Sequence, residues 1–429
     1  MQGATGRLFT LTLHNNANAP MRRSFLYYTR ILVLPLFAVG MVLTGCDSGG
    51  SNAENGSNGE NGPSAASYPA SASYSEQVAA NILSFDLGLR TGSGNIDNNS
   101  ESDLDDLYTG ANLSGQTLPT ELSGSPNQST YGEIATVDLS SLVSGDDLVR
   151  DDNIPGVSAP VNTNKLLTTY FEEADNNNAV IGDGIVVAQF AEKMLLGTPI
   201  YDKGAKILNR FANDNVADDQ AAEEWDKAFG YFGFPKTLEP FLDYSDEANA
   251  GLAEGPARDL DGDGLDLESE YAYTWATYAI ERSAKAENTN DFARRAFEAL
   301  RKGREEIAND NFSNLPSRAE TARDAWEDVV AVNVIHYINA VKGGLPSSGS
   351  LSDGDIDEGS WGEAKAFAWG LQFFNTELSS GQLNDLLEDI GSEPPYGDRT
   401  ASEYKNDLDD ALGILENAYE FNSTNVDNW

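Results

Sequence analysis

One acidic segment in the second half of the chain has the residue types and spacing of a calcium-binding loop. Asp259-Leu260-Asp261-Gly262-Asp263-Gly264 is followed, after five residues, by Glu270, which fits the pattern D-x-[DN]-x-[DN]-G-x5-E. Ca²⁺ takes about six to eight hard oxygen ligands. We expect these from the carboxylates of Asp259, Asp261, Asp263 and Glu270 and from the carbonyl of Leu265, with Gly264 permitting the sharp bend.

Two features of this loop differ from a full EF-hand. Its eighth position, usually apolar, is Asp266, and turn-like residues 251–256 stand where an EF-hand has its first helix. We therefore predict a structural calcium site, formed by the loop and one helix that carries Glu270 on its first turn and continues over 271–284. A paired calcium sensor is not expected. The alternative is a solvated acidic turn, since acids are frequent throughout this chain.

Weaker patterns suggest a second metal site and an anion site. Glu223 and Asp226 are three residues apart on a predicted helix and share a face. Together with Glu192 of a neighbouring helix they would hold a hard metal ion, unless they form a solvent-facing acidic stripe. Arg301 and Arg304 would bind an anion, or would pair with acids of their own or another helix.

The remaining residues give little support to catalysis. His336 is expected at the edge of a helical core, and no nucleophile elbow, zinc-protease helix or phosphate-binding loop is present in the sequence. The single Cys excludes an intramolecular disulfide and a Cys-cluster zinc site. The formal net charge of -42 argues against nucleic-acid and anionic-lipid partners, and favours adaptation to high salt over an ordinary acidic secreted protein.

The N-terminus predicts where the protein is located. Residues 1–45 form a signal peptide, with a possible start at Met21, and Leu43-Thr44-Gly45-Cys46 matches the site at which bacterial lipoproteins are cleaved and acylated on Cys46. Residues 46–67, rich in Gly, Ser and Asn, would be a flexible tether. We expect a lipid-anchored protein of the bacterial cell envelope, at the outer membrane or cell surface, with envelope proteins as further partners.

Helical periodicity dominates the part of the chain that would follow the tether. Residues 68–429 form the predicted helical domain, and three capping boxes begin at Ser317, Ser360 and Thr400. Gly343-Gly344 is expected to end one long helix. The fold class is all-α, a multi-helix bundle with long acidic loops. Candidate helices span 73–89, 184–197, 200–213, 217–232, 267–286 and 291–309.

Several segments resemble a lipoprotein family common in Bacteroidetes, the domain of unknown function 4856. They begin at Ser73, Trp225, Asp259 and Trp326 and read SYSEQ, WDKAFGYFG, DLDGDG and WEDVV. That family is in turn similar to the helical imelysin-like proteins, envelope proteins linked to iron uptake and marked by G-x-H-x-x-E. The corresponding residues here are Ala221, Glu223 and Asp226. The resemblance therefore implies at most a carboxylate-only site for a hard cation, and no metallopeptidase.

Together these observations favour binding over catalysis. The expected function is a calcium-stabilised, lipid-anchored ligand-binding protein, with capture of iron or another metal as one form of it. One alternative is a glycan-binding lipoprotein of a sugar-import system, which needs exposed tryptophans. The other is a hydrolase that uses paired carboxylates, which needs two acids facing one pocket.

Overall fold

The structure is a computed structural model of the chain, and it describes residues 67–92, 100–120, 122, 126–151, 154, 160–182, 184–213, 216, 220–243, 251–252, 256–286 and 291–429. All of them fall within one of two units, Asn52–Trp429; the other is Met1–Ser51. The predicted signal peptide 1–45, the acylation site Cys46 and the tether up to residue 66 lie outside the described residues. Within the described residues, no helix has the length and apolar character needed to cross a membrane.

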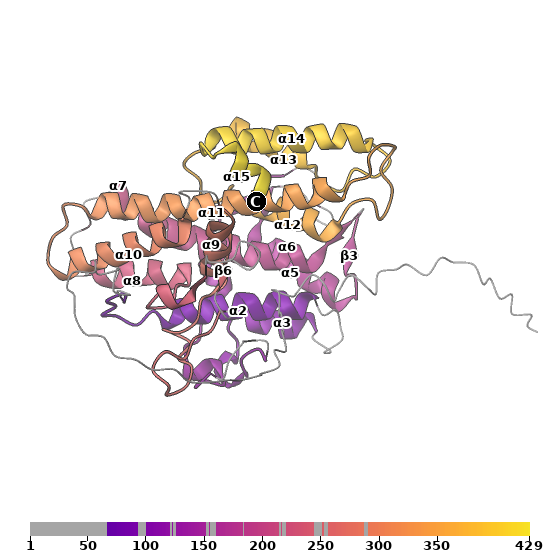
Figure 1. Cartoon of the computed structure of the whole chain (residues 1–429). Helices are drawn as coiled ribbons and strands as arrows, with labels where there is room; N and C mark the ends of the chain where they lie inside the picture. The colour runs from indigo at the N-terminus through magenta and orange to yellow at the C-terminus, as the bar shows by residue number, and fades with distance from the viewer. Residues whose placement is uncertain are drawn as a thin grey trace, which may run out of the picture. The chain divides into compact units, whose positions relative to one another are not determined.

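Helices dominate the described residues, which confirms the all-α prediction (Figure 1). Three two-residue antiparallel pairs accompany them: β1 (Leu148–Val149) with β2 (Val161–Asn162), β3 (Val180–Ile181) with β4 (Ile185–Val186), and β5 (Leu242–Asp243) with β6 (Gly251–Leu252). The α-helices are α2 (Ser75–Gly92), α3 (Glu101–Tyr108), α4 (Leu139–Leu142), α5 (Thr163–Asp175), α6 (Val187–Leu195), α7 (Lys203–Asn213), α8 (Ala221–Phe232), α9 (Thr274–Lys285), α10 (Phe292–Ala308), α11 (Leu315–Gly344), α12 (Glu358–Gly370), α13 (Ser380–Ile390), α14 (Ala401–Ala418) and α15 (Ser423–Asn428). Short 3-10 turns are η3 (Leu113–Gly115), η4 (Tyr131–Glu133) and η6 (Glu239–Phe241).

The long helix α11 is the centre of the packing. It contacts α7, α9, α10, α12, α14 and α15, and Figure 1 shows it running between the C-terminal helices and the rest. Its middle is buried around most of its circumference, from Trp326 through Val330 and Val334 to Ile338. A helix that is apolar on most sides belongs inside a bundle. It ends at Gly344, as the Gly343-Gly344 pair predicted.

Two of the three predicted capping boxes are wrong. Thr400 does cap α14, and its side chain and that of Glu403 exchange the expected hydrogen bonds. Helix α11 instead starts at Leu315 with Pro316 in its first turn, and α12 is capped by Asp357, three residues before the predicted Ser360. In both cases an upstream start is available, since Pro is well suited to a first turn and Asp is a strong cap.

A π-helical segment, Leu196–Asp202 (η5), joins α6 to α7. The segment contains Pro199, which has no backbone N–H and cannot continue an α-helical hydrogen-bond ladder. The helix α7 that follows lies close to α11, because a Cβ on Gly204 would lie only 2.3 Å from the Trp326 ring. The polar face of α7 is thereby fixed relative to the core.

Candidate functional site

The acidic loop brings three of its predicted ligands together. Carboxylate oxygens of Asp259, Asp261 and Asp263 lie within 4.8 Å of one another, and all three side chains are exposed. Asp259 accepts hydrogen bonds from the backbone N–H groups of Gly262 (2.7 Å) and Gly264 (3.2 Å). Both glycines have positive φ, +83° and +107°, which a residue with a Cβ rarely adopts. The loop therefore folds around the carboxylate of its first residue, Asp259.

The two remaining predicted ligands, Leu265 and Glu270, accept hydrogen bonds from backbone N–H groups. The Leu265 carbonyl accepts a hydrogen bond from Asn127 N–H at 2.9 Å. The buried Glu270 carboxylate accepts from Leu260 N–H (2.7 Å) and Asp266 N–H (2.9 Å). The expected position of Glu270 is wrong: it lies in the turn before α9, which begins at Thr274, and not on the first turn of a helix.

The charge of the loop suits a hard cation. A hydrogen bond with Asp261, together with repulsion from Asp261 and Asp259, raises the pKa of Asp263. A divalent cation would offset two of the three negative charges, and the carbonyl of Leu265 and both oxygens of Glu270 retain lone pairs beyond those used here. The donor set therefore fits Ca²⁺, with Asp259, Asp261 and Asp263 as the residues that would hold it.

The predicted second metal site is not assembled. Asp226 is fully buried, and its carboxylate accepts hydrogen bonds from Tyr68 OH (2.7 Å), Ser71 N–H (3.2 Å), Ala72 N–H (3.0 Å) and Arg304 Nε (2.9 Å). Of the predicted companions, Glu223 pairs with Lys227 at 2.8 Å, and Glu192 pairs with Lys193 at 2.8 Å. Among the described residues, only the three loop aspartates form a group spaced to hold a metal ion.

The predicted anion site is likewise occupied by the protein's own acids. Arg304 is the partner of Asp226, and Arg301 pairs with Glu298 (2.8 Å) and Glu305 on its own helix. Asp226 was expected at a metal and Arg304 at an anion, yet in the fold they bond to each other. The ion-pair alternative is thus the one seen for both arginines.

A pocket of about 220 Å³ carries five acids. It lies between α11, the loop after α12 and the end of α14, and its acids are Asp324, Glu327, Asp328, Glu377 and Glu420. Burial raises the pKa of Asp328 to about 6, although Arg295 pairs with it. Burial also raises the pKa of Glu327, against hydrogen bonds that its carboxylate accepts from the Thr376 N–H and hydroxyl, Glu377 N–H and Tyr419 OH.

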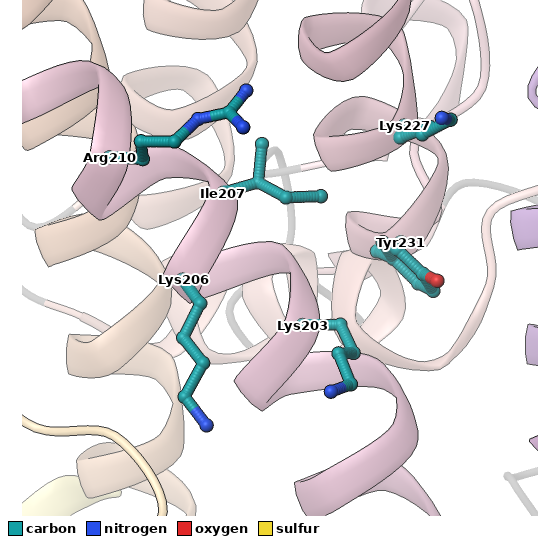
Figure 2. A pocket seen from close by; sticks show the side chains of 6 residues that line it. All are labelled: Lys203, Lys206, Ile207, Arg210, Lys227 and Tyr231. Carbon is teal, nitrogen blue, oxygen red and sulfur yellow. The ribbon is translucent and has the colours of Figure 1, made fainter. Parts of the chain in front are cut away.

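A second pocket, of about 280 Å³, is lined by cations (Figure 2). Helix α7 contributes Lys203, Lys206, Ile207 and Arg210, and α8 contributes Lys227 and Tyr231. This cluster was not predicted from the sequence. Its signal was present, because 203, 206, 207 and 210 share a face of the predicted helix 200–213, but nothing in the sequence placed Lys227 opposite them.

Residues 151–377 match the family described as Domain of unknown function (DUF4856), which covers more than half of the chain. The chain belongs to this family. No curated protein and no solved structure matches it.

The region that matches the family, residues 151–377, contains the whole acidic loop, the whole cation-lined pocket and part of the acid-lined pocket. The cation-lined pocket lies entirely within it, while the acid-lined pocket also uses Ala418, Tyr419 and Glu420 from beyond its end. The Asp226–Arg304 pair is inside the region, but the segment it holds, Tyr68–Ala72, precedes it.

The six tryptophans belong to the core, and His336 lies at its edge. All six tryptophans are buried, and four of their indole N–H groups donate to backbone carbonyls, for example that of Trp225 to Leu300 at 2.8 Å. None of them is available to stack on a sugar ring. His336 is half-buried and hydrogen-bonded to the Trp429 carbonyl at 2.9 Å, and burial lowers its pKa to about 3. Its imidazole therefore stays neutral near pH 7.

Proposed function

We propose that the protein is a lipid-anchored envelope protein whose helical domain is stabilised by Ca²⁺ and binds a ligand rather than transforming it. The observation that supports the calcium part is the convergence of Asp259, Asp261 and Asp263 in a glycine-turned loop. The lipobox at Cys46 supports the anchor and a place at the outer membrane or cell surface. The excess of acidic over basic residues supports adaptation to high salt.

Metal analysis and thermal unfolding test the calcium part. Protein purified without chelator should contain one equivalent of calcium, and chelation should lower its Tm, because a cation that binds only the folded state stabilises it. The double variant Asp261→Ala, Asp263→Ala should lose both the calcium and the response to chelator. A matched control, Asp385→Ala, Asp398→Ala, removes two exposed acids elsewhere and should keep both. No calcium in the wild type, or equal responses of the two variants, would refute this part.

Labelling with a radioactive fatty acid tests the anchor. Wild-type protein expressed in a bacterial host should incorporate the label and partition with membranes, whereas Cys46→Ser should do neither. Label retained by Cys46→Ser would contradict acylation at this residue.

The proposal does not extend to iron capture at Glu192, Glu223 and Asp226, because each of these carboxylates is ion-paired within the fold. The resemblance to imelysin-like proteins contributes only the expectation of binding over catalysis. The glycan-binding alternative loses the exposed tryptophans on which it depended.

A carboxylate-dependent hydrolase is the second candidate, since the acid-lined pocket gives it a location. Asp328, with its raised pKa, would be the proton donor, and Glu377 would be the second carboxylate. A panel of p-nitrophenyl glycosides provides the assay. If the wild type hydrolyses a glycoside and both Asp328→Asn and Glu377→Gln abolish this activity, the protein is a hydrolase and the binding proposal is wrong. If the wild type shows no hydrolysis, or if both variants keep it unchanged, the hydrolase candidate is wrong.

A further inference from the structure

We propose that the pocket between α7 and α8 binds a small organic molecule that carries an oxyanion, a carboxylate or a phosphate, next to an apolar group. The proposal deepens the binding function above and rests on it only in that the protein binds a ligand. Among the described residues, the lining of this pocket contains four cations, Lys203, Lys206, Arg210 and Lys227, and no acid. In a chain with 69 acids and 27 basic residues, the convergence of four cations on one pocket favours a ligand of opposite charge.

The cations keep hydrogen-bond donors for such a ligand. Lys206 donates to Asp202 (2.7 Å) and Asp147 (3.3 Å), and an ammonium has three N–H groups, so one remains. Lys227 is in the same situation, with Glu223 at 2.8 Å and Glu224 at 3.0 Å.

Within the part of the chain that the structure describes, Lys203 and Arg210 have fewer ion-pair partners than Lys206 and Lys227. Among the described residues, Arg210 pairs with one acid, Glu224, at 3.6 Å, which leaves most of its five N–H groups. Among the residues that the structure describes, Lys203 has no ion-pair partner. Lys203 and Arg210 therefore carry most of the unused donor capacity of the pocket, and Arg210 is suited to bind an oxyanion with two parallel hydrogen bonds.

The acids that hold these cations lie outside the pocket lining. Asp147 and Asp202 are buried and hold Lys206, while Glu223 and Glu224 extend from α8 and hold Lys227. These contacts restrict the lysine side chains before a ligand arrives, which reduces the entropy lost on binding. The α7 backbone is also fixed, because Gly204 packs directly against Trp326.

The apolar part of the lining defines the rest of the ligand. The Ile207 side chain lies between the cationic groups, and Tyr231 lies on the α8 side (Figure 2). A volume of about 280 Å³ is at the small end for ligand pockets. A monomeric ligand with one oxyanion and one ring or short aliphatic chain fits both features, whereas a polymer does not.

Isothermal titration calorimetry of the lipidated protein in mild detergent tests the proposal with phenyl phosphate as the probe. Phenyl phosphate should bind more tightly than inorganic phosphate, because only it reaches Ile207 and Tyr231, and benzyl alcohol should not bind measurably. Affinity should fall as salt is added. The variant Lys203→Gln, Arg210→Gln should bind at least about tenfold more weakly, since hydrogen bonds to charged groups contribute more than the 1.4 kcal/mol that tenfold requires.

Matched controls separate this site from general charge effects and from the calcium loop. Lys302→Gln, Arg318→Gln removes two cations from other surfaces and should leave the affinity unchanged. Asp261→Ala, Asp263→Ala should also leave it unchanged, so a failure of the calcium proposal does not decide this one. Absence of phenyl phosphate binding, or equal loss in both cation variants, would overturn the proposal.

A lipid headgroup is the other source of a phosphate, and co-sedimentation with phosphatidic acid vesicles distinguishes it. A chain with a net charge of -42 should be repelled by such vesicles, and we use the Cys46→Ser variant so that the anchor plays no part. Sedimentation that Lys203→Gln, Arg210→Gln abolishes would overturn the assignment to a soluble ligand.

Discussion

Replacement of Asp226 tests whether this residue holds the segment Tyr68–Ala72 in place. Its carboxylate is fully buried and joins Arg304 of α10 to Tyr68, Ser71 and Ala72 by four hydrogen bonds between 2.7 and 3.2 Å. Asp226→Ala would leave the guanidinium of Arg304, whose side chain is 3% exposed, without its counter-charge. Breaking a buried ion pair on one side costs about 3–5 kcal/mol.

Urea unfolding followed by tryptophan fluorescence measures this cost. Trp225 is adjacent to Asp226 and fully buried, so its emission reports on this region. Glu223→Ala is the matched control on the same helix, because it removes a carboxylate that is half exposed and paired with Lys227; it should cost about 1 kcal/mol or less. The double variant Asp226→Leu, Arg304→Met should recover much of the loss, since a buried pair replaced by apolar groups is often neutral.

Native-state hydrogen exchange gives a local readout of the same prediction. The amides of Ser71 and Ala72, which donate to Asp226, should exchange faster in Asp226→Ala, while amides in the middle of α11 lose protection only to the extent that global stability falls. A cost below about 1 kcal/mol, or one equal to that of Glu223→Ala, would refute the reasoning.

Three further predictions concern packing and titration. Gly303→Ala should destabilise the protein by about 1–3 kcal/mol in urea unfolding, because its Cβ would lie 2.1 Å from the Trp225 ring, whereas Gly413→Ala, with nothing within 4 Å, should stabilise by up to about 1 kcal/mol. Equal effects would contradict this packing. Burial raises the pKa of Asp202 to about 6, so its contribution to stability is present below pH 3.8 and is lost as pH rises through 6. Asp202→Asn should therefore flatten the stability profile between pH 4 and 6, and an unchanged slope would contradict the shift. The pKa of His336 is lowered to about 3, so its imidazole NMR signals should not move between pH 5 and 8; a titration near 6.5 would show that the ring is hydrated.

Local sequence features were good guides wherever the interacting residues are neighbours in the chain. The helical class, the Thr400 cap and the end of α11 at Gly344 follow from periodicity and short-range hydrogen bonds. The proximity of Asp259, Asp261 and Asp263 belongs to the same group, because one turn with two glycines is enough to gather them. Two helix starts were predicted wrongly because a second start signal lies just upstream: Pro316 precedes the predicted Ser317, and Asp357 precedes the predicted Ser360.

Local patterns along the chain were therefore enough to predict the class of fold and to point to a calcium loop and to an anchor at Cys46. The tertiary structure selected the partners of the charged residues, because an ion pair depends on which helices pack together. It paired Asp226 with Arg304 across 78 residues of chain, and so removed a metal ligand and an anion ligand at once. It also placed Lys227 opposite Lys203 and Arg210, and grouped acids of α11 with Glu420 after α14. Those contacts arise from the burial of apolar faces, which carries the charged side chains with it.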